Sequence, residues 1–342
     1  MPGYIVSNLV VLLLLAGAAY VARAVRRSDL WRGAALDLWR RRPLAILVVA
    51  IYLAIGLLDS VAWVGGAAEA SGDLVAQFKP RSLIDRMFSE GFKERSYSAP
   101  FARVEFYGGM TLENPGRHPL GTDILGRDIL HLVLKGTRIA LLIGGLTSLI
   151  VIPLALFFGI SAGYYGGRID DAVFFVMSTL ASIPSLLLLI ALIMAMGQGP
   201  VQVCIAMGVT SWVGFCRIVR GETFKLRELD YVQAARALGV SEGRIILRHI
   251  LPNLMHLVVI TFVLLFSGLV LSEAILAWLG IGIDGSWGQM IDQARDELAR
   301  DPVIWWNLGA ASTALFGLIL AVNLLGDAVR DVLDPRTLRE LP

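Results

Sequence analysis

The residues that could support catalysis or metal binding form no motif for either activity. The histidines form no His-Glu-x-x-His pattern and the cysteines no Cys-x-x-Cys pair; they are His118, His131, His249, His256, Cys204 and Cys216. No Gly-x-x-x-x-Gly-Lys-Ser/Thr phosphate loop occurs either. We therefore expect no catalytic residue, no metal site and no ATP bound by such a loop in this chain.

Two glycine patterns match enzyme motifs but lie in the wrong context. Residues 280–285 (Gly-Ile-Gly-Ile-Asp-Gly) fit a dinucleotide-binding loop, but they follow an apolar segment rather than a strand. Residues 159–163 (Gly-Ile-Ser-Ala-Gly) fit a nucleophile elbow, but they lie inside an apolar run. The spacing of Gly159, Gly163 and Gly167 instead predicts close packing between helices.

One ionisable residue, Glu273, lies inside the apolar run 254–281, with Ser267 and Ser272 nearby. An ionisable side chain at membrane depth usually faces a bundle interior or a water-filled path. Two interpretations stay open. These residues line or gate a solute pathway, or Glu273 makes a structural hydrogen bond near the membrane interface.

A polar stretch, residues 230–252, separates two apolar runs and predicts two short helices joined at a glycine. Asp230 is expected to cap the first helix, with Gln233 at its third position as in a capping box. Gly239 suits the left-handed residue that ends a helix. The residues expected on one apolar face are Ala234, Ala235 and Leu238.

The second helix of this stretch also has start and stop signals. Ser241 is expected to cap it, while Arg248 and His249 fall in its last turn, where the helix dipole favours cations. Pro252 is expected to end it. Held at a membrane surface, such a helix pair would present a docking site for a soluble partner.

The composition is that of an all-α integral membrane protein. Of the 342 residues 56% are hydrophobic and 17% charged, against about 25% charged in soluble domains. The net charge of +2 does not suggest nucleic acid as a partner. Seven apolar runs predict membrane-spanning helices: residues 4–22, 43–64, 138–164, 172–196, 199–216, 254–281 and 304–326.

Basic residues predict the orientation in the bilayer. Arginines in residues 23–42 follow the first run, which favours a retained helix with its N-terminus outside; an uncleaved signal-like anchor with different processing is the alternative. Crossing once per helix then places residues 217–252 and the C-terminal tail, residues 327–342, in the cytoplasm.

The polar segment 65–120 predicts a small extracytoplasmic subdomain, either a connector or a docking element. Its apolar spacing predicts an amphipathic helix at 83–88, and its alternation permits a strand at 101–107. Thr122 or Asp123 is expected to cap a following helix that lies in the membrane interface.

The motifs together resemble the membrane subunits of ATP-binding-cassette importers, specifically the C-type permease of the dipeptide/oligopeptide/nickel family. The cytoplasmic loop of that family matches Gln233, Ala234, Ala235, Gly239, Leu251 and Pro252. Its signature before the second core helix matches Gly121, Thr122, Asp123, Gly126, Arg127 and Asp128. Its C-terminal third matches residues 286–288 (Ser-Trp-Gly) and Asn323, Gly326, Asp327, Arg330, Asp334 and Pro335.

The resemblance implies a type I importer permease with six core helices, here with one extra N-terminal helix, in the bacterial inner membrane. It implies a different permease as heterodimer partner, two cytoplasmic ATPases that bind ATP and Mg, and an extracytoplasmic substrate-binding protein. It also implies that residues 230–252 dock on an ATPase. Peptides are the expected substrates, with nickel complexes, glutathione or other small solutes as alternatives.

Three departures from the family pattern are the extra helix, the long segment 65–120, and Gln233 in place of the usual Glu. We expect Gln233 to be tolerated because an amide also fits the third position of a helix. The expected division of the chain is 1–42, 43–64, 65–137, 138–326 and 327–342.

Two other classes of function compete with the importer interpretation. The first is an ATP-independent channel or secondary transporter, which lacks support because no clear inverted repeat and few buried charges are evident. The second is a membrane-anchored scaffold or enzyme whose working part is segment 65–120, in which no catalytic constellation is recognisable.

Overall fold

The computed structural model describes residues 42–63, 81–88 and 93–333, together with the isolated residues 8, 11, 12, 16, 23 and 38–40. The predicted helix 4–22 falls outside the continuous described ranges, and so do the motif residues Asp334 and Pro335.

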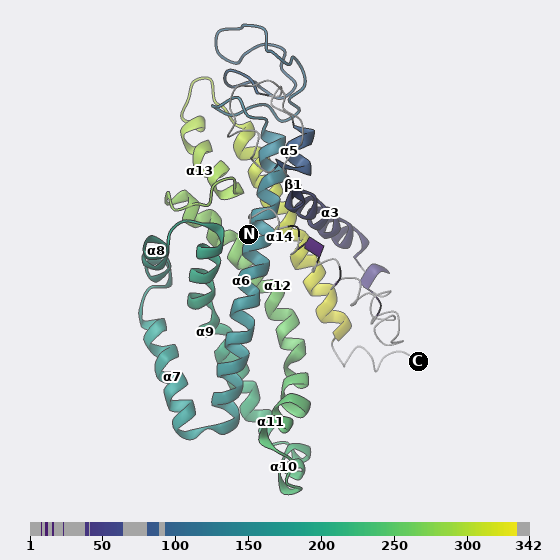
Figure 1. Cartoon of the computed structure of the whole chain (residues 1–342), viewed down its shortest axis with the longest axis vertical. Coiled ribbons are helices and arrows are strands. Elements are labelled where there is room, and N and C mark those ends of the chain that lie inside the picture. Colours follow the sequence, from purple (N-terminus) through teal and green to yellow (C-terminus); the bar gives the residue numbers. More distant parts are fainter. Residues whose placement is uncertain are drawn as a thin grey trace. The chain divides into compact units, whose positions relative to one another are not determined.

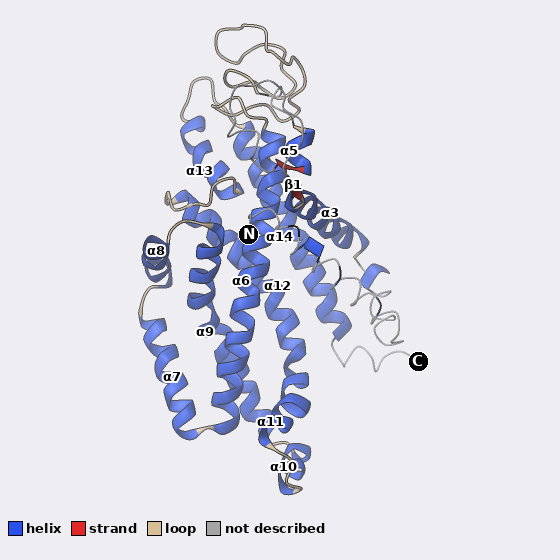
Figure 2. Ribbon diagram, in the orientation of Figure 1, coloured by secondary structure: helices blue, strands red, loops and turns tan. Residues whose placement is uncertain are grey.

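Helices make up most of the described chain, as predicted for an all-α membrane protein (Figure 2). The long helices are α3 (Pro43–Ser60), α6 (Ile129–Tyr165), α7 (Gly167–Ser182), α8 (Ser185–Met196), α9 (Pro200–Arg227), α12 (Leu251–Trp278) and α14 (Trp306–Leu333). The shorter ones are α5 (Leu83–Met87), α10 (Asp230–Ala237), α11 (Glu242–Ile245), the π-helical turn η2 (Ile246–Ile250) and α13 (Trp287–Leu298). Strands β1 (Ala62–Trp63) and β2 (Arg81–Ser82) pair antiparallel.

Five described helices are long and apolar enough to cross a membrane, or six if α7 and α8 form one broken span. The prediction of an unbroken helix over 172–196 is wrong, because α7 and α8 meet at an angle of 89°. The break lies at Ile183 and Pro184, where Ile183 is extended. Proline disfavours helical backbone in the residue before it, and this explains the position of the break.

The chain divides into two compact units, each described here by itself. The first unit contains residues 1–141 and 274–324, and the second contains residues 142–273 and 325–342.

In the second unit, glycines bring α6 close to α9. A Cβ atom at Gly159 would lie 2.7 Å from Cγ1 of Val219, and one at Gly163 would lie 2.6 Å from Cβ of Thr223. The predicted close packing is confirmed at these two positions. It is wrong for Gly167, which has a φ of 51° and begins α7 instead.

In the first unit, the predicted amphipathic helix at 83–88 is present as α5. Ser82 and Asp85 form a reciprocal capping box at its start. Asp85 also accepts a 2.6 Å hydrogen bond from Nζ of Lys135, which anchors α5 to α6. The strand permitted at 101–107 is reduced to one isolated bridge between Val104 and Thr111.

Helix α13 packs on α6 through the residues of the Ser-Trp-Gly motif. The Ser286 hydroxyl caps α13 by accepting from the backbone N–H of Gln289 at 3.0 Å. The indole Nε1 of Trp287 donates to the carbonyl oxygen of Val133 at 2.8 Å. Gly136 leaves room for this indole ring, because a Cβ atom there would overlap it.

Candidate functional site

We name residues 230–252 the coupling segment; it contains α10, α11, η2 and the start of α12. Figure 1 shows α10 at one end of the second unit, beyond the ends of α6 and α9, with α11 directly above it in this view. Val232, Ala235, Ile245 and Ile250 are buried here in one apolar core cluster with residues of α6 and α9. The segment is therefore packed onto the helices next to it.

The predicted capping box at Asp230 is wrong. The N-cap of α10 is Leu229, and no side chain of the described residues caps this end by a hydrogen bond. The backbone already turns at Leu229, whose carbonyl accepts from Val232 and Gln233, so Asp230 becomes the first helical residue. The Gln233 side chain instead donates through Nε2 to the carbonyl oxygen of Arg227 at 2.8 Å.

This hydrogen bond of Gln233 has a clear physical basis. The last carbonyls of an α-helix have no partner within their own helix, and Arg227 is the final residue of α9. The amide of Gln233 satisfies one of them. An ionised Glu at this position would have no proton to donate.

The positive φ predicted for Gly239 is present, at 76°. The N–H of Gly239 donates to the carbonyl of Arg236 at 3.0 Å, and that of Val240 to the carbonyl of Ala235 at 3.1 Å. This pair of bonds is the Schellman arrangement that closes a helix. In the described structure no atom lies within 4 Å of the place where a Cβ of residue 239 would sit.

The predicted shared face of Ala234, Ala235 and Leu238 is wrong. Ala235 is buried together with Val232, whereas Ala234 is exposed and the exposed fraction of Leu238 is 83%. Tyr231 is also exposed, at 44%. Because α10 has two apolar faces, only tertiary packing decides which is covered. Residues 231, 234 and 238 recur at helical spacing and form an exposed apolar stripe.

The second helix starts where predicted but does not end at Pro252. Ser241 is the N-cap residue of α11, although its side chain makes no capping hydrogen bond in the described structure. From Glu242 the chain stays helical through Leu251 and Pro252 to Trp278, with the π-helical turn η2 in between. Proline removes one helical hydrogen bond, and a widened turn before it accommodates this loss.

Side chains next to Pro252 stabilise the π-helical turn. Nδ2 of Asn253 donates to the carbonyl oxygen of His249 at 2.6 Å and to the hydroxyl of Tyr231 at 3.1 Å. The rings of Tyr231 and His249 lie 6.0 Å apart between centroids. These contacts tie α10 to α12, while Arg248 is exposed.

The other family signature, residues 121–128, forms a loop rather than the predicted interfacial helix. Asp123 folds this loop by accepting from the backbone N–H groups of Leu125 at 3.0 Å and Arg127 at 2.8 Å. Gly126 has a φ of 68°, and a Cβ atom there would overlap the backbone of Glu94. The aspartate that closes this turn leaves its N–H groups unavailable for a helix.

Helix α6 begins only after this loop, and Asp128 caps it. Oδ1 of Asp128 accepts from the backbone N–H of His131 at 3.2 Å, and Oδ2 lies 2.8 Å from Nδ1 of His118. Nε2 of His118 lies 3.3 Å from Oε1 of Glu94. Burial lowers the pKa of His118, but the two carboxylates outweigh burial and the pKa is raised.

The sequence interpretation missed His118 and Glu94, because no motif spacing links them to Asp128. Within the same loop Gly121 has a φ of 78°, and the Thr122 hydroxyl accepts from the N–H of Ser98 at 2.7 Å. We name residues 93–128 the signature loop. Buried polar side chains of this loop bind other groups of the same loop, as at Thr122, His118 and Asp123.

The possible pathway residues lie on α12. Glu273 is 5% exposed and Ser267 is 7% exposed. The hydroxyl of Ser272 donates to the carbonyl oxygen of Gly268 at 2.8 Å, within its own helix. A pathway role for the three residues stays a prediction.

The described part of the C-terminal motif has a packing role at Gly326. A Cβ atom there would overlap Val263, so the glycine allows α14 to approach α12 within the second unit. Asp327 and Arg330 are exposed and Asn323 is half-buried. Among the described residues, no three His, Cys, Asp or Glu side chains cluster to hold a metal ion.

Comparison with curated proteins identifies several permease relatives. The glutathione transport system permease protein GsiD of Pectobacterium atrosepticum is 37% identical over 64% of this chain and 73% of its own length. The dipeptide transport system permease protein DppC of Bacillus subtilis is 35% identical over 65% and 70%. The oligopeptide transport system permease protein OppC of Haemophilus influenzae is 35% identical over 65% and 71%.

A solved structure supports the fold. A chain of the inward-facing MetNI methionine ABC transporter matches with a TM-score of 0.50 at 19% identity, over 60% of this chain and 98% of that chain. Residues 155–339 match the family described as "Binding-protein-dependent transport system inner membrane component". The predicted resemblance is confirmed: this multi-pass membrane protein belongs to the family of inner membrane components of binding-protein-dependent transport systems, as a permease of the ABC importer type.

Proposed function

We propose that this chain forms half of the translocation pathway of an ATP-driven importer for di- or oligopeptides. Partner ATPases would drive its conformational change through the coupling segment. The relatives are named for dipeptide, oligopeptide and glutathione transport, which supports this substrate class. A different permease subunit would form the other half of the pathway, and an extracytoplasmic binding protein would deliver the substrate. Nickel complexes or other small solutes are the alternative cargo.

The observation that carries the coupling role is the exposed apolar stripe of α10. An apolar helix face lying in a partner's groove is a common docking mode, and Leu238, at 83% exposure, is its most accessible side chain. The same helix is buried on its other face through Val232 and Ala235. A partner that grips the stripe therefore pulls on packed helices rather than on a loose loop.

ATP chemistry belongs to partner subunits in this proposal, because the chain contains no phosphate loop. Two cytoplasmic ATPases would bind ATP and Mg. Their closure would move α10, and the helical continuity from Glu242 to Trp278 would carry that movement into the membrane. Residues 230–252 and the C-terminus would face the cytoplasm, and the N-terminus the outside.

Leu238→Glu tests the docking role. In the complete transporter, reconstituted in proteoliposomes, we expect this variant to lose ATPase subunits during purification and to lose more than about 90% of uptake, because a charge enters an apolar contact. Ala237→Glu adds the same charge to an exposed neighbour outside the stripe and serves as the control. Full assembly and uptake with Leu238→Glu would refute the docking role.

Two further measurements address the cargo and the energy source. Mass spectrometry of the ligand bound to the co-purifying binding protein identifies the substrate, and a bound nickel complex would exclude the peptide assignment. Uptake driven by an ion gradient in vesicles that contain this chain alone would favour a secondary transporter instead.

A further inference from the structure

An arginine of α10 reaches the end of α6 within the second unit. The guanidinium carbon of Arg236 lies 5.2 Å from the centroid of the Tyr164 ring, a cation–π distance. Nη2 of the same guanidinium lies 3.8 Å from Oε2 of Glu242 on α11. Arg236 lies on α10 and therefore contacts both α6, which precedes α10 in the sequence, and α11, which follows it.

The hydroxyl of Tyr164 adds a polar group to this contact. Tyr164 is 3% exposed, and its hydroxyl faces the charged side chains of Arg236 and Glu242. A buried hydroxyl left without polar contacts is unfavourable, so these two side chains stabilise it.

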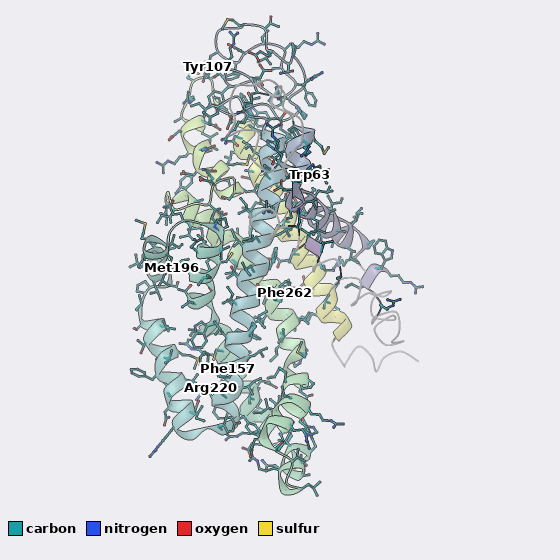
Figure 3. The ribbon with its side chains drawn as sticks, in the orientation of Figure 1. Trp63, Tyr107, Phe157, Met196, Arg220 and Phe262 are labelled. Atoms are coloured by element: carbon teal, nitrogen blue, oxygen red, sulfur yellow. The ribbon has the colours of Figure 1, made fainter. Side chains whose placement is uncertain are left out.

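A second connection runs through the end of α9. Gln233 donates to the carbonyl oxygen of Arg227, and Nη1 of Arg227 donates to the carbonyl oxygen of Gly163 at 3.0 Å. About two turns earlier on α9 lies Arg220, which is labelled in Figure 3. Its Nε and Nη2 both donate to the carboxylate of Asp170 on α7, with Nη2 at 2.7 Å. Side-chain contacts thus join the C-terminal parts of α6 and α9 and the N-terminal part of α7.

Helix α10 depends on such connections for a fixed orientation. It has eight residues, too few for a stable isolated helix. Val232 and Ala235 anchor it in the apolar core, and Tyr231 binds Asn253 of α12. Its connection to α11 runs through Gly239, a residue with high backbone freedom.

We propose that Arg236 is a positioning residue that, with Tyr164 and Glu242, latches the coupling segment to the end of α6. A displacement of α10 then moves α6 at once, instead of being absorbed by rotation at Gly239. Arg227 and Gln233 form the second attachment, so losing Arg236 loosens α10 without detaching it. The importance of the latch for transport rests on the proposed function, whereas its mechanical role does not.

A distance measurement tests the mechanical role without any partner. Spin labels at Ala237→Cys on α10 and Arg168→Cys in the first turn of α7, directly after the end of α6, occupy exposed positions. The native Cys204 and Cys216 are fully buried. In the full chain in lipid nanodiscs we expect one narrow distance distribution, and a broadened one after Arg236→Ala. The control Lys225→Ala removes an exposed cation that pairs within its own helix, and should change nothing. An unchanged width in Arg236→Ala would overturn the latch.

A coupling measurement tests its use in transport. In the complete transporter we expect Arg236→Ala to retain its ATPase subunits and to raise the ATP hydrolysed per substrate imported about three- to fivefold, because one cation–π contact is lost. Arg236→Lys should restore part of the coupling, since the charge remains but the planar guanidinium does not. Tyr164→Ala combined with Arg236→Ala should be no worse than either change alone.

The two proposals fail in different ways. A normal coupling ratio in Arg236→Ala, with Leu238→Glu still defective, would refute the latch and leave the docking role intact. Normal assembly in Leu238→Glu, with a broadened distance in Arg236→Ala, would refute the docking role and leave the latch. Additive effects of Arg236→Ala and Tyr164→Ala would show that the two residues act independently.

Discussion

The signature loop and the coupling segment are both polar stretches between apolar helices, yet different forces hold them. The signature loop is closed by buried side-chain hydrogen bonds, above all those joining His118, Glu94 and Asp128. The coupling segment is closed by backbone hydrogen bonds at Gly239 and by apolar contacts of Val232 and Ala235. Buried polar contacts therefore hold the first, whereas backbone bonds and apolar packing hold the second, whose helix α10 also carries the exposed stripe.

The comparison suggests a rule for this chain. A loop held by buried polar groups that bind one another needs no partner to satisfy those groups. The coupling segment has its backbone hydrogen bonds satisfied but exposes apolar side chains, which a partner subunit would cover. Substitutions should therefore damage folding in the signature loop and coupling in the coupling segment.

Gly126→Ala should have the largest effect on folding. The added Cβ would overlap the backbone of Glu94 and also requires a φ of 68°, so we expect a loss of about 3–5 kcal/mol, measured as a lower thermal unfolding midpoint in detergent. Gly116→Ala in the same loop shares the positive φ, at 73°, but has open space. Equal losses for the two variants would show that the close approach to Glu94 has no energetic role.

Asp128→Ala should have the next largest effect. It removes the cap of α6 and one of the two carboxylates around buried His118, at a cost of about 2–4 kcal/mol. Thermal unfolding measures the loss. Glu113→Gln changes a carboxylate of an exposed pair with Arg95 at 3.6 Å, and should be nearly neutral.

The same cluster predicts a pH dependence of the signature loop. The raised pKa of His118 means that its contribution to stability is complete below the unfolded value of 6.5 and is lost as pH rises through the folded pKa. Amide hydrogen exchange of residues 113–122, corrected for intrinsic rates, should show weaker protection at alkaline pH. His118→Gln should remove this dependence, and its persistence would assign the titration to another group.

Gly239→Val should lower stability less than the signature-loop variants do, but it should lower the coupling between ATP hydrolysis and uptake more. An added Cβ atom meets nothing within 4 Å in the described structure, so we expect the φ of 76° to be the main penalty, at about 1–2 kcal/mol. The Schellman turn should distort and move the stripe, which lowers uptake while the partner ATPase stays active. Normal uptake would count against a docking role for this turn.

Gln233→Glu should have the smallest effect. The variant loses a hydrogen bond from an exposed side chain to Arg227, worth about 1 kcal/mol, and gains a favourable charge in the first turn of α10. We expect uptake within about twofold of the parent protein. A large loss would mean that the amide proton donated to α9 is essential.

Several features of the fold follow from local sequence signals. Long apolar runs predict most of the spans, and glycine spacing predicts the close approach of α6 to α9. Gly239 predicts its own left-handed turn, because few other residues adopt that conformation at low cost. Ordered motifs spread over the chain predict the permease family, which the relatives confirm.

Other features depend on which of two competing signals at the same place is stronger, and the sequence pattern does not rank them. The helix passes through Pro252 because Asn253 and the π-helical turn satisfy the disturbed backbone, whereas Pro184 breaks its span. Proline alone does not distinguish these outcomes. In the same way, the capping signal at Asp230 lost to the turn at Leu229, and Thr122 with Asp123 formed a loop instead of a helix start.

The sequence by itself determined that this is a helical membrane permease with a polar segment at residues 230–252, since hydrophobicity and local backbone preference are properties of neighbouring residues. Only the tertiary structure decided which face of α10 is buried, which carboxylates surround His118 and which tyrosine Arg236 meets. Those choices depend on packing, hydrogen bonding and charge between residues distant in the chain, and no local pattern encodes them.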